Sequence, residues 1–103
     1  MSTEKKVAIV TGGGSGLGLA IAKAFTANNV KTIIVGRDEE KLKAAKAELG
    51  ENGFYKTCDL SDLSSIPALI ENIVAEFGQI DILVNNAGIN QKKIFEEVTD
   101  EEF

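Results

Sequence analysis

Hydrophobic residues along the chain fall into two alternating patterns: short, nearly unbroken apolar runs, and longer segments in which apolar residues recur at helical spacing. Short apolar runs are typical of strands that are buried on both faces, since such strands need no alternating polar side. They predict strands at residues 6–10, 31–35, 54–58 and 81–84. The periodic segments predict one helix between each pair of consecutive strands, the first at residues 16–27.

Local signals predict where the first two helices end and where the second begins. The pair Asn28-Asn29 follows the first helix, and asparagine tolerates the left-handed conformation that commonly ends a helix. Asp38 is the expected N-cap of the second helix, because its short carboxylate accepts backbone N–H groups of the first turn. Gly50 is expected to terminate this helix.

The third helix is bounded by a proline and a glycine. A proline deep inside a helix removes a backbone bond and clashes with the preceding turn, so Pro67 belongs in the first turn. The N-cap is therefore expected at Ser64 or Ser65, and the helix is expected to stop at Gly78. The alternation of strands with helices of this length predicts an α/β fold with a parallel sheet and right-handed crossovers.

The segment Thr-Gly-Gly-Gly-Ser-Gly-Leu-Gly joins the first strand directly to the first helix. A helix N-terminus exposes backbone N–H groups at the positive end of the helix dipole, and these groups bind phosphate. Glycines allow the tight turn and keep Cβ atoms away from a ligand. We therefore expect a nucleotide pyrophosphate here, with a plain spacer turn as the alternative. The expected contacts are Thr11, Gly12, Gly14, Ser15, Gly16, Leu17 and Gly18.

Two motifs in this chain resemble those of the short-chain dehydrogenase/reductase family. The glycine segment has the spacing T-G-x-x-x-G-x-G, not the G-x-G-x-x-G of other dinucleotide sites, and N-N-A-G occurs at residues 85–88. The resemblance runs from Lys6 to about Phe103, and within the family it is greatest to bacterial ketoacyl-carrier-protein reductases and related sugar or alcohol dehydrogenases. It implies that residues 1–103 form a single dinucleotide-binding domain. The implied fold is a three-layer Rossmann-type parallel sheet with strand order 3-2-1-4, which is incomplete relative to the full family fold.

The residues that follow the second strand bear on the choice between NADP(H) and NAD(H). Gly36 stands where a Rossmann site commonly places the acidic residue that holds the ribose hydroxyls, and Arg37 comes next. A guanidinium binds a 2′-phosphate in a bidentate manner, whereas an acid would repel it, so NADP is expected and NAD is the alternative. Two observations oppose this interpretation: Arg37 has acids of the second helix nearby with which to pair, and Ser15 occupies a position that is basic in many NADP-preferring relatives.

The resemblance also assigns roles beyond the third and fourth strands. It implies that the Asp59 carboxylate accepts a hydrogen bond from the adenine amino group and that the Leu60 backbone borders the ring. An aspartate that caps the next turn is the alternative for Asp59. The resemblance further implies that the backbone at Asn86 and Ala87 lines the ribose side of the cofactor, with Gly88 allowing close approach. Residues of this type would otherwise indicate a strand-ending turn.

Composition excludes several other classes of protein. The net charge of −5 argues against a nucleic-acid partner, and no apolar run is long enough to cross a bilayer. A single cysteine, Cys58, permits no internal disulfide, which is typical of the cytoplasm. Cys58 is expected to be a small buried strand residue, because the chain has no histidine to activate its thiol. No metal site is expected.

Catalytic residues are not expected within this chain. The family's Tyr, Lys, Ser and Asn lie beyond the fourth strand, and the only tyrosine here, Tyr55, lies in the third strand. The segment from Thr99 has the pattern of a capped helix start that stops at Phe103, so we expect an N-terminal portion of a longer reductase. Copies are expected to associate, through the exposed edge of the fourth strand. A non-catalytic nucleotide-binding module, or a structural fragment without activity, is the alternative.

Overall fold

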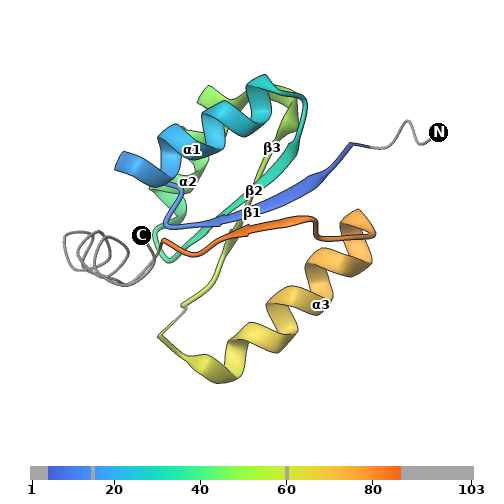
Figure 1. The fold of residues 1–103 in the computed structure, drawn as a ribbon. Helices are drawn as coiled ribbons and strands as arrows, with labels where there is room; N and C mark the ends of the chain where they lie inside the picture. The colour runs from blue at the N-terminus through green and yellow to red at the C-terminus, as the bar shows by residue number, and fades with distance from the viewer. Residues whose placement is uncertain (1–4, 15, 60, 87–103) are drawn as a thin grey trace, which may run out of the picture.

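A four-stranded parallel sheet forms the centre of the molecule (Figure 1). The computed structural model describes residues 5–14, 16–59 and 61–86. The strand order is β3-β2-β1-β4, which confirms the order that the family resemblance implies. The strands are β1 (Val7–Thr11), β2 (Lys31–Gly36), β3 (Gly53–Thr57) and β4 (Ile82–Val84).

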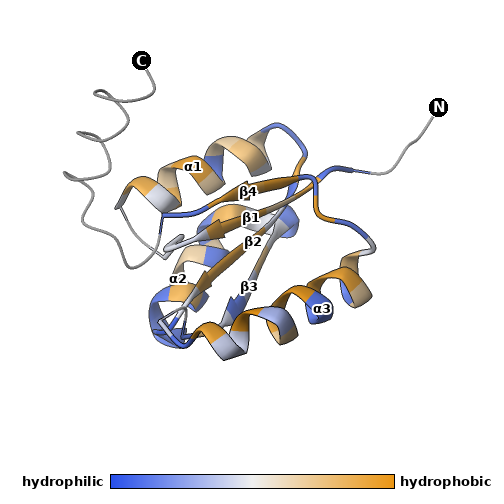
Figure 2. Ribbon diagram, turned by 60° about the horizontal axis from the view of Figure 1, so that its bottom comes forward, coloured by the Kyte–Doolittle hydropathy of each residue, from blue (hydrophilic) through white to orange (hydrophobic). Residues whose placement is uncertain are grey.

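Helices cover both faces of this sheet, so the fold has the three layers that were expected. Helix α3 (Ile66–Phe77) lies on one face, and helices α1 (Gly16–Ala27) and α2 (Glu39–Leu49) lie on the other (Figure 2). Alternate residues of β1 and β2 face the two helical layers. Ile9 and Ile33 pack with Ile73 of α3, while Val10 and Ile34 pack with α1 and α2 on the other face. All four of these strand residues are buried, which explains the unbroken apolar runs in the sequence.

The observed strand limits differ by one residue from those expected. Strand β3 ends at Thr57, so Cys58 lies just beyond it and is half-buried; its placement as a buried strand residue was wrong. The backbone N–H of Cys58 still donates to Gly36 O at 2.8 Å. Likewise, Asp81 lies before β4 but donates its N–H to Val7 O at 2.8 Å. The backbone hydrogen bonds of the sheet therefore continue one residue after β3 and one residue before β4.

The helix limits agree with the local signals. Asp38 is the N-cap of α2, and its side chain accepts the Lys41 N–H at 3.2 Å. Asn29, after α1, has a φ of 68°, and Gly78, at the end of α3, is left-handed with a φ of 89°. Gly50 follows α2 with a φ of 81°. Each of these residues tolerates the conformation at little cost.

The start of α3 has a feature that the sequence patterns did not predict. A short 3₁₀ turn, η2 (Leu63–Ser65), precedes the helix, and Asp62 caps it by accepting the Ser64 N–H at 3.1 Å. Ser65 is the N-cap residue of α3 and Pro67 lies in the first turn, as expected. The Ser65 hydroxyl, however, donates to Asp62 O at 2.8 Å instead of capping α3.

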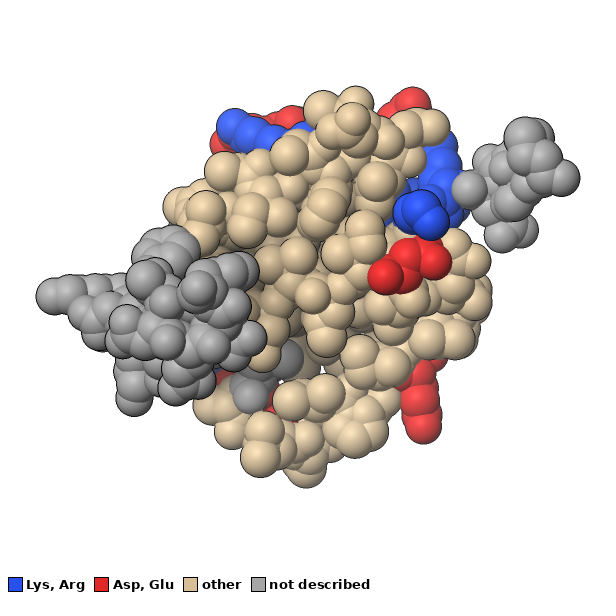
Figure 3. All heavy atoms as spheres, in the orientation of Figure 1, with Lys and Arg blue, Asp and Glu red and all other residues tan. Residues whose placement is uncertain are grey.

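Strand β4 lies at an edge of the sheet, because among the described residues it pairs only with β1. The face that carries it, between α1 and α3, shows few charged side chains (Figure 3). Leu83 on β4 is 61% exposed and Val74 on α3 is 43% exposed. Association of copies through this edge stays a prediction. Among the described residues, no helix has the length and apolar character needed to cross a membrane.

Asp81 fixes the amino end of the sheet. Its Oδ2 accepts the Val7 N–H at 2.8 Å and the Gln79 side-chain amide at 2.7 Å, which joins the first residue of β1 to the segment before β4. The Val7 bond is the main cause that lowers the pKa of the Asp81 carboxyl, with smaller contributions from Gln79 and the charge of Lys6. Hydrogen bonds to the ionised form favour that form.

We expect the stability difference between the wild type and Asp81→Ala to depend on pH. A folded-state pKa below the ordinary value of 3.8 contributes stability that is fully present above that value and is lost as pH falls through the folded pKa. Urea unfolding should therefore show a constant difference in the free energy of unfolding between the two proteins near pH 7. This difference should become smaller below about pH 4 and continue to shrink toward pH 3. A difference of the same size at every pH would contradict this role.

Candidate functional site

The carboxyl ends of the four strands bring the predicted site residues to one edge of the sheet. Gly12 follows β1, Arg37 follows β2, Asp59 follows β3 and Asn86 follows β4. In an open parallel sheet, the crevice for a ligand lies at this edge, where the strand order reverses between β1 and β4. Four expected contacts, Ser15, Leu60, Ala87 and Gly88, lie outside the described residues.

The glycine turn, residues 11–18, leads from β1 into α1, and Gly12 and Gly16 in it have positive φ angles. Gly12 has a φ of 67° and donates its N–H to Val35 O at 2.8 Å. The glycines of the turn therefore begin at a residue that is still hydrogen-bonded to β2. Gly16, the first residue of α1, has a φ of 60°, and a Cβ added there would meet no atom of the described residues within 4 Å. Leu17 is 40% exposed. The start of α1 is thus exposed at Gly16 and Leu17, which leaves room for an anion at this helix N-terminus.

Gly18 is a glycine because of close packing within this turn. It is buried, and a Cβ added to it would collide with the Gly12 carbonyl oxygen and lie 2.9 Å from the Asn86 side-chain nitrogen. Only the absence of a side chain lets α1 approach the end of β1 and the segment after β4 this closely. The absence of a side chain at Gly18 therefore sets how closely the start of α1 packs against Gly12 and Asn86.

Gly13 was not among the predicted residues, yet it is as constrained as Gly18. A Cβ on Gly13 would collide with the Ile34 side chain of β2, and Gly13 itself is buried. The family spacing treats this position as unrestricted, so no sequence signal pointed to it. By contrast, a Cβ on Gly14 would make ordinary contacts, at 3.5 Å from Lys41 Cβ and 3.6 Å from Leu42 Cδ2.

Thr11 holds the glycine turn to the segment after β4. Its side chain is buried, and its hydroxyl accepts the Asn86 N–H at 2.6 Å. The same hydroxyl lies 3.2 Å from Val84 O and 3.2 Å from Asn85 Oδ1, and it donates toward these acceptors. The cofactor contact at Thr11 stays a prediction; in the structure its side chain joins the end of β1 to the segment after β4.

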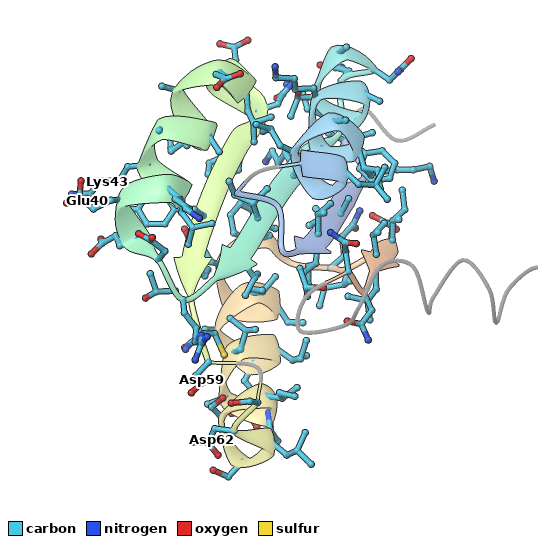
Figure 4. All side chains as sticks on the ribbon, turned by 90° about the vertical axis from the view of Figure 1, so that its left-hand side faces the viewer. Glu40, Lys43, Asp59 and Asp62 are labelled. Atoms are coloured by element: carbon cyan, nitrogen blue, oxygen red, sulfur yellow. The ribbon has the colours of Figure 1, made fainter. Side chains whose placement is uncertain are left out.

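Arg37 and Asp59 are both exposed at the ends of neighbouring strands. Figure 4 shows Asp59 beyond the end of β3, on the way to α3. Asp59 Oδ1 accepts the Ser61 hydroxyl at 2.6 Å and the Ser61 N–H at 3.0 Å. These two bonds, with the charge of Arg37 as a smaller cause, lower the pKa of the Asp59 carboxyl. The turn-capping alternative for Asp59 is thus present, and its contact with adenine stays a prediction.

The alternative for Arg37, pairing with acids of α2, is not observed. Within residues 5–14, 16–59 and 61–86, the ion pairs are Lys23–Glu48 and Lys56–Glu76. The positive charge of Arg37 therefore stays at the edge where the expected ligand would bind.

Tyr55 is not among the residues at the carboxyl ends of the strands. It is in the middle of β3, and its hydroxyl donates to Glu39 Oε2 at 3.0 Å, the main cause that raises the pKa of Tyr55. The described residues contain no group of three or more His, Cys, Asp or Glu side chains that could hold a metal ion. The chemistry available at this edge is the binding of an anionic ligand by backbone N–H groups and a guanidinium.

Comparison with known proteins agrees with the fold and motifs. The family model described as short chain dehydrogenase matches residues 6–103. The chain is similar to 3-oxoacyl-(acyl-carrier-protein) reductase FabG of Salmonella typhimurium, with 42% identity over 103 residues. That match covers 100% of this chain and 42% of the relative, so the chain spans less than half the length of this curated protein.

Two solved structures extend the similarity to three dimensions. The 3-ketoacyl-(acyl-carrier-protein) reductase from Brucella melitensis, complexed with NADH, has a TM-score of 0.77 and 41% identity over 85% of this chain and 36% of its own. A variant of actinorhodin polyketide ketoreductase with NADPH has a TM-score of 0.78 and 38% identity over 86% of this chain and 36% of its own. These two structures contain different nicotinamide dinucleotides.

Proposed function

The chain belongs to the short-chain dehydrogenase family, and we propose that it forms the part of an NADP-dependent oxidoreductase that binds the adenosine and pyrophosphate of the cofactor. One observation carries the proposal: α1 begins at the exposed residues Gly16 and Leu17, with open space beside Gly16, at the point where the sheet order reverses between β1 and β4. A pyrophosphate is the anion that such a turn accommodates in a Rossmann-type fold.

The proposed roles are those that the family resemblance implies. The N–H groups of the glycine turn hold the pyrophosphate, with Ser15 and Leu17 at the start of α1. Asp59 and Leu60 border the adenine, and Asn86, Ala87 and Gly88 line the ribose side. Thr11 acts through Asn86, whose N–H it accepts at 2.6 Å. When bound, the cofactor supplies a hydride to, or takes one from, a carbonyl or alcohol carbon.

Arg37 determines the proposed preference for NADP. No acidic side chain ends β2, since Gly36 stands there, and the Arg37 guanidinium is exposed beside that end. A guanidinium forms two parallel hydrogen bonds with a phosphate, and NAD has no phosphate at this position. Solved relatives contain either NADPH or NADH, so this residue, more than the family, supports the choice.

Hydride transfer itself is proposed to need residues that this chain does not carry. Its only tyrosine donates to Glu39 within the α2 layer. We propose that the chain binds the cofactor and shows no turnover on its own, within a protein that acts in the cytoplasm. The substrate is a carbonyl or alcohol compound, as in the whole family.

Calorimetric titration with NADP⁺ and NAD⁺ tests the proposal. We expect the wild type to bind NADP⁺ more tightly, with amide shifts at Gly12, Gly16 and Gly18. Arg37→Ala should weaken NADP⁺ binding by about tenfold to a hundredfold, because a hydrogen bond to a charged group contributes about 1.5–3 kcal/mol. The affinity for NAD⁺ should change by less than about twofold, since NAD⁺ has no partner for this guanidinium.

Two results would contradict the proposal in different ways. Absence of heat and of amide shifts at saturating nucleotide would refute the binding site. An equal loss of NADP⁺ and NAD⁺ affinity in Arg37→Ala would retain the site but refute the assignment of this residue to the 2′-phosphate.

A further inference from the structure

Lys41, in the first turn of α2, lies directly against the glycine turn. A Cβ built on Gly14 would be 3.5 Å from Lys41 Cβ, which is ordinary van der Waals contact. The backbone at Lys41 is held in place, because its N–H donates to the N-cap carboxylate of Asp38 at 3.2 Å. The base of the Lys41 side chain is thus fixed beside the residue that precedes Ser15 in the turn.

Two acidic side chains near Lys41 accept hydrogen bonds, and a third points away from the glycine turn. Glu39 Oε2 accepts the Tyr55 hydroxyl at 3.0 Å, and Asp38 Oδ1 accepts the backbone of Lys41 itself. Figure 4 shows Glu40 on the outer side of α2, away from the glycine turn. Neither of the two ion pairs in the described part of the chain includes Lys41. Since the base of this flexible side chain contacts Gly14, its ammonium group can reach the space beside the glycine turn.

Arg37 and Lys41 lie at the two sides of the α2 N-cap. Arg37 directly precedes Asp38, at the end of β2, and Lys41 is in the first turn that follows it. A ligand group that sits between the end of β2 and the glycine turn would be within reach of both of these long, flexible side chains. A phosphate monoester carries a charge of about −1.5 to −2 at neutral pH, so two cations match it better than one.

We infer that Lys41 is a second cationic contact for the 2′-phosphate of NADP(H), in addition to Arg37. This inference rests on the proposed function and adds a specificity-determining residue to that site. It also answers the objection that Ser15 supplies no positive charge from the glycine turn: the charge comes from α2, across the Gly14 contact. Arg37 provides a planar fork that binds two phosphate oxygens, and Lys41 provides a compact charge on a flexible chain.

A matched pair of lysine variants tests the inference. Lys41→Ala and Lys43→Ala remove the same charge from the same helix, but Lys43 is on the outer side of α2 in Figure 4. Calorimetry with NADP⁺ and NAD⁺ should show that Lys41→Ala weakens NADP⁺ binding by about fivefold and leaves NAD⁺ binding unchanged. Lys43→Ala should leave both affinities unchanged, and Lys41→Arg should restore the preference for NADP⁺. The effect of Lys41 should shrink as salt is raised, since the side chain is exposed.

The outcomes separate this inference from the proposed function. If the wild type binds neither nucleotide, the proposed function fails and this inference fails with it. If the wild type prefers NADP⁺ and Arg37→Ala removes the preference, but Lys41→Ala matches Lys43→Ala, only this inference fails. Equal weakening of both nucleotides by Lys41→Ala would place the ammonium on the pyrophosphate and overturn the assignment. Thermal melting of each variant establishes that the binding measurements refer to folded protein.

Discussion

Gly18→Ala is expected to lower the free energy of unfolding by about 3 kcal/mol and to abolish detectable dinucleotide binding. The added Cβ would collide with the carbonyl oxygen of Gly12 and approach the Asn86 side-chain nitrogen. A backbone oxygen held at the end of a strand has no alternative rotamer, since Gly12 is fixed by its own bond to Val35 O. Helix α1 would have to shift away from β1, and the N–H groups at its start would shift with it.

Urea unfolding and calorimetry with NADP⁺ measure these two effects. Gly14→Ala is the matched control in the same turn, because its Cβ would make only ordinary contacts at 3.5 Å and 3.6 Å. We expect the free energy of unfolding of this control to lie within about 1 kcal/mol of the wild-type value. If Gly18→Ala and Gly14→Ala have the same stability and affinity, the close approach at Gly18 does not shape the site.

Thr11→Val is expected to cost about 1–3 kcal/mol of stability and to weaken dinucleotide binding. Valine has nearly the same shape but no hydroxyl, so the Asn86 N–H loses the acceptor at 2.6 Å, and Val84 O and Asn85 Oδ1 lose a donor. The side chain of Thr11 is buried, so water does not readily replace the hydroxyl. The segment after β4 would then be held less firmly against the glycine turn.

Amide hydrogen exchange gives the most direct measurement for Thr11→Val. Exchange at Asn86 should accelerate in the variant, whereas exchange at Ile33 in the centre of β2 should follow global unfolding alone. Thr11→Ser keeps the hydroxyl and should preserve both protection at Asn86 and nucleotide affinity. If the Asn86 amide exchanges as slowly in Thr11→Val as in Thr11→Ser, the Thr11 hydroxyl does not hold the segment after β4.

Patterns confined to neighbouring residues determined the elements of this fold. The apolar runs predicted the limits of all four strands to within one residue, because buried parallel strands need apolar side chains on both faces. The N-cap at Asp38 and the left-handed ends at Asn29 and Gly78 were also predictable, since each depends on bonds within one or two turns. The strand order came from the motifs, through the family they resemble, and not from periodicity.

The contacts that shape the site were decided only by the tertiary structure. Thr11 meets Asn86 across 75 residues, Gly13 is restricted by Ile34, and Lys41 lies against Gly14. Asp81 accepts the Val7 N–H across 74 residues in the same way. None of these pairs leaves a signal in local sequence, because which side chains face each other depends on strand register and on how closely each helix packs on the sheet. The sequence alone therefore determined which segments form the site, and the packing of α1, α2 and β4 around β1 decided which of their atoms meet.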